Sequence, residues 1–242
     1  MNPLDRLRLE KAATDCGFEM TPVTTSEGLE LRSARFPETV LVKVMGEKHF
    51  MVSASDPGIL DQSAGGGSLQ LSGFGELYAV LRKTAAFART KPNRIADTFK
   101  KQTATMPKTT EAERLVVQRV GQGLFRSALL DYWQGKCCVT GLDVPELLRA
   151  SHIRPWAHCD TDEQRLDVFN GLLLAPHLDA LFDGGWISFD DAGTLLLSEQ
   201  LPVGTLETLG LSMNNGIAQL KPAHYPYLFH HRHHVLRSKP LI

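Results

Sequence analysis

The first part of the chain changes from a helical hydrophobic pattern to an extended one and back. Residues 3–16 carry leucines and alanines at helical spacing, which predicts an amphipathic helix. Short alternating or β-branched runs follow and predict antiparallel strands. The predicted strands are residues 29–32, 40–44 and 49–52, and a second predicted helix covers residues 74–87. Residues 1–95 are therefore expected to form a small α+β domain, and no motif in it indicates a role.

A polar segment separates this domain from a second series of elements. Residues 96–109 have mixed polar composition and predict a linker. A long helix begins after Thr110, where Glu113 three positions on completes a capping box, and Gly135 supplies its stop. Further predicted elements are strands at 144–153 and 170–174, a helix from 176, a hairpin at 186–198 and a helix around 230–235. Residues 110–242 thus predict a second domain.

Composition is that of a packed globular protein without a membrane segment. The chain has 242 residues, of which 43% are hydrophobic, and no uncharged apolar run is long enough to span a bilayer. Its first residues lack the apolar core of a signal peptide. The four cysteines, Cys16, Cys137, Cys138 and Cys159, form no C-x-x-C pair, and the adjacent Cys137 and Cys138 are expected to be reduced thiols. We expect a cytoplasmic location.

Positive charge gathers where the two predicted domains meet. The net charge is −1, but residues 1–108 hold 15 Lys and Arg against 12 Asp and Glu. Residues 82–108 alone hold eight basic side chains against Asp97. This basic stretch is either a segment that follows a phosphate backbone or a solvated linker. Its candidate contacts with nucleic acid are Arg89, Lys91 and Arg94.

The chemistry-bearing residues gather between positions 151 and 183. His152 ends a short apolar run, Asn170 follows, and His177, Asp179 and Asp183 come soon after. Cleavage of a phosphodiester needs a base that deprotonates water, a divalent ion on the phosphate and a brace for the base. Because Asp179 and Asp183 are four residues apart, one helix face can present both to one ion.

These residues and their surroundings resemble the HNH endonuclease family over roughly residues 110–200. The resemblance rests on Cys138-Val139-Thr140-Gly141, on Ala150 to Trp156, on Arg165-Leu166-Asp167 and on Asn170 to Asp183. It implies an α+β fold in which the small N-terminal α+β domain is followed by a C-terminal ββα-metal (HNH) nuclease domain with flanking helices.

The resemblance also implies roles for single residues. His152 is expected to be the general base, and Asn170 to brace the loop between the two strands. Asp179 and Asp183 are the expected metal ligands, and His177 is either a third ligand or a hydrogen-bond partner of one.

Two positions depart from the family pattern. Ser151 stands where many members have an acidic or histidine ligand, and Asp179 stands where the family usually has its last histidine. The oxygen-rich donor set favours Mg²⁺ or Mn²⁺, whereas a set with His177 would also suit Ni²⁺ or Zn²⁺.

Four arginines of the second domain are further candidates for binding nucleic acid. Arg119 and Arg126 lie on the long helix and are either phosphate contacts or solvent-exposed helix charges. Arg154 and Arg165 flank the expected base and are either phosphate contacts or partners of Asp167.

The sequence therefore predicts a metal-dependent DNA endonuclease that leaves 5′-phosphates, as the resemblance implies. Restriction or another defence against foreign DNA is the expected setting, with the N-terminal domain selecting the target or sensing a partner. Because a single-metal site cuts one strand, a homodimer is expected for double-strand cleavage. Two alternatives remain: a catalytically degenerate DNA-binding or interaction module, and a nuclease directed at RNA. The C-terminal histidines around residues 230–234 are interpreted as surface or packing residues.

Overall fold

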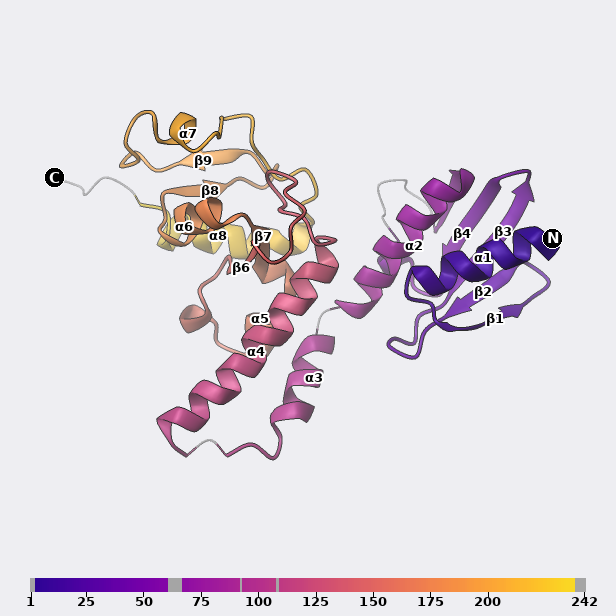
Figure 1. The fold of residues 1–242 in the computed structure, drawn as a ribbon. Coiled ribbons are helices and arrows are strands. Elements are labelled where there is room, and N and C mark those ends of the chain that lie inside the picture. The colour runs from indigo at the N-terminus through magenta and orange to yellow at the C-terminus, as the bar shows by residue number, and fades with distance from the viewer. Residues whose placement is uncertain (1–2, 61–66, 92, 108, 238–242) are drawn as a thin grey trace. The chain divides into compact units, whose positions relative to one another are not determined.

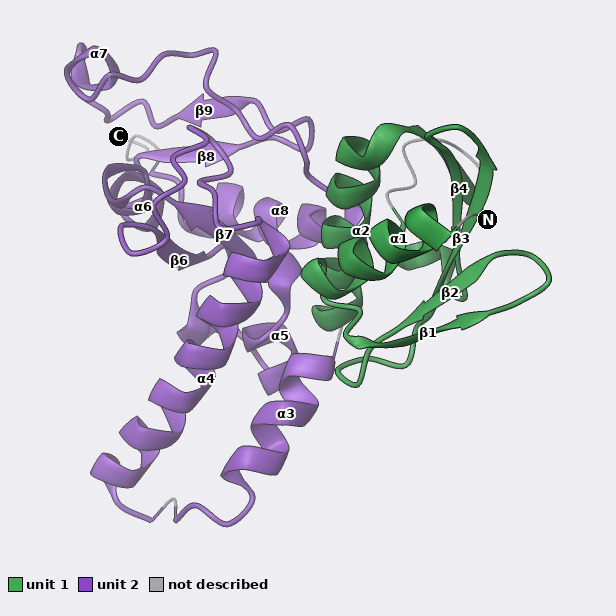
Figure 2. Cartoon of the chain, turned by 45° about the vertical axis from the view of Figure 1, so that its right-hand side comes forward, with its two compact units in different colours: residues 1–91 green, residues 92–242 purple. Residues whose placement is uncertain are grey.

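The chain forms two compact units, Met1–Lys91 and Pro92–Ile242 (Figure 2). They belong to a computed structural model that describes residues 3–60, 67–91, 93–107 and 109–237 (Figure 1). Both units combine helices with antiparallel sheets, so the predicted α+β class is confirmed. None of the helices in the described part of the chain is long and apolar enough to cross a membrane.

The first unit is a five-stranded antiparallel sheet with strands in chain order, together with two helices. Its helices are α1 (Pro3–Asp15) and α2 (Gly73–Arg89). Its strands are β1 (Met20–Thr24), β2 (Leu29–Arg32), β3 (Val40–Gly46), β4 (His49–Ala54) and β5 (Ser68–Ser72), with the short helix η1 (Pro57–Ile59) after β4. Alternate strand residues share one core with the inward faces of α1 and α2.

The sequence predicted β2, β3, β4 and both helices of this unit, but not the outer strands β1 and β5. β1 contains Pro22 and is almost wholly exposed, so it lacks the alternation that marks a half-buried strand. Proline is tolerated there because β1 pairs with β2 alone and lies at the edge of the sheet. β5 offers only two leucines among polar residues.

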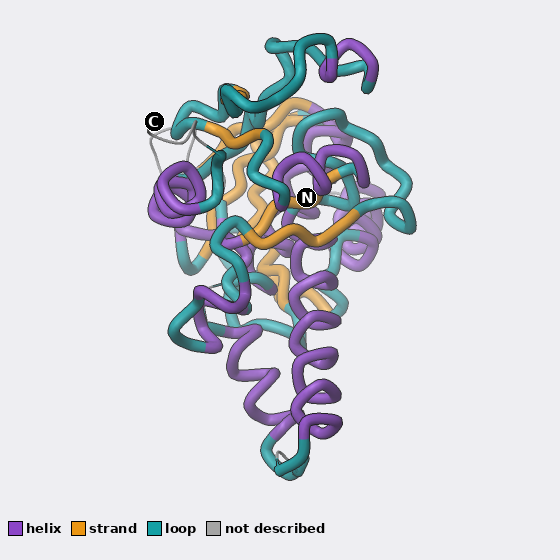
Figure 3. Tube along the Cα trace, turned by 90° about the vertical axis from the view of Figure 1, so that its left-hand side faces the viewer, coloured by secondary structure: helices purple, strands orange, loops and turns teal. Residues whose placement is uncertain are grey.

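The second unit begins with two helices that run side by side, α3 (Arg94–Thr103) and α4 (Glu111–Tyr132) (Figure 3). The prediction of a linker at residues 96–109 is therefore wrong for the first half of that segment, which is helical. The reason is a buried stripe at helical spacing, formed by Ile95, Phe99 and Thr103, which lies among polar residues that concealed it. Lys108, at the end of the basic stretch, lies outside the described residues.

A pair of strands and a helix form the centre of the second unit. β6 (Arg149–His152) pairs antiparallel with β7 (Gly171–Leu174), and α6 (Pro176–Asp183) follows β7 directly. The connection between the strands holds η3 (Trp156–His158), α5 (Asp162–Arg165) and η4 (Val168–Asn170). After α6 come the hairpin β8 (Ile187–Phe189) and β9 (Leu195–Leu197), then α7 (Thr205–Thr208), η5 (Pro222–His224) and α8 (Tyr225–His234).

Close packing of α4 fixes the position of this strand pair. Every residue of β7 is buried, and a Cβ on Gly171 would lie 2.6 Å from the Phe125 ring and 2.7 Å from Leu129. Glycine is therefore required where the strand meets the helix. The capping box predicted for α4 is present, since Thr110 accepts from the Glu113 amide and Glu113 accepts from that of Thr110.

Candidate active site and metal centre

His152, the last residue of β6, is held on two sides by aromatic rings. Phe125 of α4 stacks on the imidazole with centroids 3.9 Å apart, and Trp156 meets it edge-on at 5.5 Å. Burial lowers the pKa of His152 below its usual value, so the ring is neutral at pH 7. A neutral imidazole has one nitrogen able to accept a proton.

The tautomer of His152 follows from its hydrogen bond. Its Nε2 lies 2.8 Å from the backbone carbonyl oxygen of Arg165. Because a carbonyl oxygen can only accept, Nε2 carries the proton in the neutral ring, and Nδ1 keeps the lone pair. Arg165 secures this carbonyl with its own side chain, which donates to Cys159 O at 2.6 Å and to Asp162 Oδ1 at 3.0 Å.

Asn170 ties together the loop between β6 and β7. Its side chain is fully buried, accepts from the Arg154 amide at 2.7 Å, and donates to the carbonyls of Arg154 at 3.2 Å and Gln164 at 3.0 Å. Its amide group also lies 3.3 Å from the Cys159 sulfur. An amide fits this position because it supplies acceptor and donors together. These bonds fix the chain on both sides of the carbonyl that orients His152.

Two carboxylates of α6 converge on the neighbouring strand residue, Ser151. The buried Ser151 hydroxyl donates to Asp183 Oδ1 at 3.3 Å, and its proximity to Asp179 lowers the pKa of that carboxyl. Burial raises the pKa of both carboxyls, and repulsion from Asp179 raises that of Asp183 further. Two carboxylates that repel each other on one helix face form a site that a cation would stabilise.

His177 does not join this pair. It lies two residues before Asp179, which places the two side chains on opposite sides of a helix. Within the described ranges, no group of three or more His, Cys, Asp or Glu side chains is arranged to hold a metal ion. The structure thus brings Asp179 and Asp183 together, and the role of His177 as a third ligand or as a hydrogen-bond partner of one stays a prediction.

Two carboxylates suit one class of ion. Mg²⁺ retains several waters and is commonly bound through one or two carboxylates and the phosphate of its substrate, whereas a closed Zn²⁺ site needs more nitrogen or sulfur ligands. The all-oxygen donor set of Asp179 and Asp183 fits Mg²⁺ or Mn²⁺, whereas a set that included His177 would also suit Ni²⁺ or Zn²⁺.

Three of the four candidate DNA-binding arginines of the second unit have partners within the protein. Arg126 donates to the carbonyls of Leu148 at 2.6 Å and Pro145 at 2.7 Å. Arg154 pairs with Asp160 at 3.0 Å, and Arg165 pairs with Asp162. Arg119 is exposed on α4.

The expected partner of Arg154 and Arg165, Asp167, instead accepts from the Tyr227 hydroxyl at 2.9 Å and caps η4. These contacts show Arg126, Arg154 and Arg165 acting as braces of the loops around β6.

The basic stretch divides between the two units. Lys91 pairs with Glu38 at 2.9 Å and also with Asp56, so its charge is used within the first unit. Arg89 ends α2, and Arg94 begins α3 in the second unit. The stretch is thus two helix ends and a junction, not one continuous segment.

The C-terminal histidines have different surroundings. His231 is buried, stacks on Phe182 at 3.8 Å and lies 3.0 Å from the Ser188 hydroxyl. His230 lies 3.5 Å from His158. The interpretation of the C-terminal histidines as packing residues therefore applies to His231.

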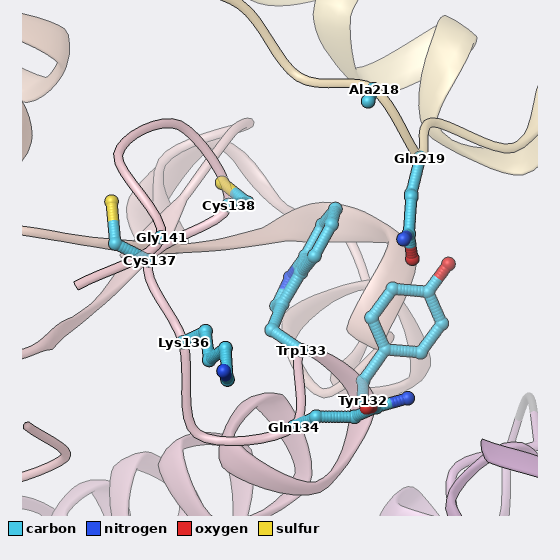
Figure 4. Close-up of a pocket in the computed structure, with 9 residues that line it drawn as sticks. All are labelled: Tyr132, Trp133, Gln134, Lys136, Cys137, Cys138, Gly141, Ala218 and Gln219. Atoms are coloured by element: carbon cyan, nitrogen blue, oxygen red, sulfur yellow. The ribbon is translucent and has the colours of Figure 1, made fainter. Parts of the chain in front are cut away.

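A cavity of about 240 Å³ lies elsewhere in the second unit (Figure 4). It is lined by Tyr132, Trp133, Gln134, Lys136, Cys137, Cys138, Gly141, Ala218 and Gln219. The lining contains no histidine or carboxylate, and burial raises the pKa of Cys138 well above its usual value, which keeps that thiol protonated. All four cysteines are free in the structure, including Cys137 and Cys138. The cavity therefore lacks a histidine or carboxylate that could act as the base in hydrolysis.

The sequence did not mark Phe125 as part of the site. No spacing rule connects this residue of the long helix with a histidine on a later strand. Its signal was indirect: Gly171, opposite His152 in the strand pair, is the small residue that lets α4 approach.

Comparison with known proteins agrees with this geometry. Residues 137–190 match the HNH endonuclease family. No curated protein matches the chain. The matched segment begins before β6 and ends just after β8, so it contains the strand pair, the loop, His152, Asn170 and both carboxylates of α6. Residues 137–190 of this chain are therefore similar to the HNH endonuclease domain, a type of domain found in nucleases.

Proposed function

We propose that this chain is a metal-dependent DNA endonuclease with His152 as its general base. The observation that carries the proposal is the Nε2 contact with the Arg165 carbonyl, which leaves Nδ1 of a neutral imidazole able to accept a proton. Ser151, the preceding residue on β6, contacts the Asp179 and Asp183 carboxylates. The proposed base therefore follows directly, on β6, the serine that contacts the carboxylate pair of α6.

The reaction uses these groups in one displacement. Nδ1 of His152 takes a proton from water, whose oxygen bonds to phosphorus as the bond from phosphorus to the 3′-oxygen breaks. The 3′-oxygen leaves with the bonding electron pair and is protonated by solvent, so the products are a 5′-phosphate and a 3′-hydroxyl. Asp179 and Asp183 would hold a divalent ion, which would supply positive charge to the phosphate and the leaving oxygen.

The wider role follows from the domain arrangement and the sequence resemblance. In this proposal the first unit selects the target or senses a partner, and the setting is restriction or another defence against foreign DNA. Cleavage of both strands by a site with one ion would require two copies of the chain.

One alternative has a specific observation in its favour. Only two carboxylates converge at the metal site among the residues that the structure describes, and Ser151 replaces an acidic or histidine ligand. A catalytically degenerate HNH domain that binds DNA without cutting it would have such a reduced donor set.

Incubation with supercoiled plasmid in Mg²⁺, Mn²⁺, Ni²⁺ or EDTA separates the two functions. We expect nicking with Mg²⁺ or Mn²⁺ and none with EDTA. DNA binding without nicking in any ion would favour the degenerate module. A structured RNA of similar length, incubated in parallel, tests for an RNA-directed nuclease, which would cut the RNA and spare the plasmid.

A further inference from the structure

Positive charge is scarce in the HNH segment, and most of it is used internally. Residues 137–190 contain three arginines and no lysine. Arg154 pairs with Asp160, and Arg165 is bound to Asp162 and to the Cys159 carbonyl. Arg149 differs, because its side chain is exposed and no hydrogen bond or ion pair to it occurs among the described residues. It is the cation of this segment that remains available to an incoming ligand.

The strand geometry places Arg149 beside the carboxylates. Arg149 and Ser151 are two residues apart on β6, so their side chains leave the same face of the strand. Ser151 contacts Asp183 at 3.3 Å on that face, and the positive charge of Arg149 lowers the pKa of Asp179. The side chain therefore lies at the solvent edge of the proposed metal site, where a substrate would arrive.

A phosphodiester needs such a group at this position. The substrate is an anion approaching two carboxylates, and its negative charge grows at the phosphate oxygens during the displacement. A guanidinium matches two phosphate oxygens with parallel hydrogen bonds and stays charged at all relevant pH values. Donors aimed at developing charge contribute more to the rate than to ground-state affinity.

We propose that Arg149 is a catalytic residue that donates hydrogen bonds to the non-bridging oxygens of the scissile phosphate. The inference rests on the proposed nuclease function and adds to it the residue that receives the phosphate. Arg149 forms a substrate site with the Asp179 and Asp183 pair, whereas Arg126, Arg154 and Arg165 hold the surrounding loops.

The test compares Arg149→Ala and Arg149→Lys with the matched control Lys136→Ala, which removes one exposed positive charge from the same unit. Single-turnover cleavage is measured on plasmid DNA and on bis(4-nitrophenyl) phosphate, a diester without a DNA backbone. We expect Arg149→Ala to slow both reactions by about 10²–10³-fold. Arg149→Lys should lie between that variant and the wild type, and Lys136→Ala should match the wild type.

Two binding measurements separate catalysis from other roles. Affinity for a short labelled duplex in EDTA should change less than about tenfold, as expected when one phosphate interaction is removed. Affinity for Mn²⁺, measured by titration calorimetry, should not fall. Thermal unfolding of Arg149→Ala should match that of the wild type, because the side chain is exposed.

Several results would overturn the inference while leaving the nuclease proposal intact. Wild-type rates for Arg149→Ala on both substrates would remove Arg149 from the reaction. Slower cleavage of plasmid alone, matched by weaker DNA affinity, would make it a distant DNA contact. Weaker Mn²⁺ binding would mean that it acts through the carboxylates. An inactive wild type would instead overturn the proposed function itself.

Discussion

At the scale of single residues, the site depends on charges placed where water is partly excluded. Burial disfavours the ionised forms of Asp179 and Asp183, and repulsion from Asp179 further disfavours ionised Asp183. Carboxylates in this situation are retained where a cation offsets the repulsion. The structure therefore predicts opposite effects of their removal on metal binding and on folding stability.

Asp179→Asn and Asp183→Asn should each weaken Mn²⁺ binding while leaving the free energy of unfolding without metal unchanged or higher, because each removes a repulsive charge and keeps the shape. Titration calorimetry and urea unfolding in EDTA measure the two quantities. Asp143→Asn, an exposed carboxylate of the same unit, is the control. Unchanged Mn²⁺ affinity in both variants would exclude them as ligands.

At the scale of elements, α4 is the support against which the candidate base is held. Its Phe125 stacks on His152, and its Gly121 faces Trp156, so the helix contacts both rings of the site. α4 lies outside the segment that matches the HNH family, which begins at residue 137 and ends at 190. Helix α4 thus provides a packing surface behind the candidate base that lies outside the matched segment.

Two glycines of α4 give a matched test of this packing. A Cβ on Gly121 would lie 2.8 Å from the Trp156 ring and 3.3 Å from Phe99, whereas one on Gly123 would meet nothing within 4 Å. Gly123→Ala should stabilise the protein by about 0.5–1 kcal/mol through helix propensity. Gly121→Ala should destabilise it by roughly 1–3 kcal/mol and slow cleavage, because Trp156 must move. Urea unfolding measures the stability of both variants. Equal stabilisation by Gly121→Ala and Gly123→Ala would show that α4 is not closely packed against Trp156.

Two buried histidines at the C-terminal helix α8 predict that the folded protein loses stability in acid. Burial lowers the pKa of His231, and of His224 just before the helix, from about 6.5 to about 4. The unfolded chain therefore binds protons below pH 6.5 that the folded chain does not, so stability falls as pH drops from about 6.5 to 4, by up to roughly 3 kcal/mol for each histidine.

Urea unfolding across this pH range measures the slope. His231→Phe should flatten it, whatever the absolute stability, while the exposed His233→Gln should leave it unchanged. A slope that is the same in His231→Phe and in the wild type would contradict the assignment of a neutral buried His231.

At the scale of the whole molecule, the chain forms one unit with a five-stranded sheet and a second unit that contains the segment similar to the HNH family, and the basic stretch runs from one to the other. If Arg89 and Arg94 bind phosphates, replacing both with Ala should lower affinity equally for all DNA sequences. The log–log salt slope should become shallower by roughly 0.9 for each phosphate interaction removed. Lys91→Ala should instead lower stability, because Glu38 and Asp56 lose their shared partner. Fluorescence anisotropy at several salt concentrations tests the first result; an unchanged slope would exclude both arginines.

Features that depend on short spacings along the chain could be predicted from the sequence, whereas features that depend on packing between distant segments could not. The capping box of α4, the β8–β9 hairpin and the carboxylate pair on α6 each follow from short spacings, and each is present. The edge strand β1, the helix α3 and the Phe125 stack depend on partners far away in sequence. Helical geometry separates the side chains of His177 and Asp179, which are two residues apart, so spacing along the chain could not decide whether His177 is a ligand or a hydrogen-bond partner of one.

The most direct test of the central claim is plasmid nicking by the wild type and by His152→Ala in Mg²⁺, with the ends of the products analysed. The account predicts that the wild type leaves 5′-phosphates. His152→Ala should be slower by about 10²–10⁴-fold, and it should keep wild-type Mn²⁺ affinity, because His152 supplies the base and the carboxylates hold the ion. A His152→Ala variant that nicks at the wild-type rate would contradict the account.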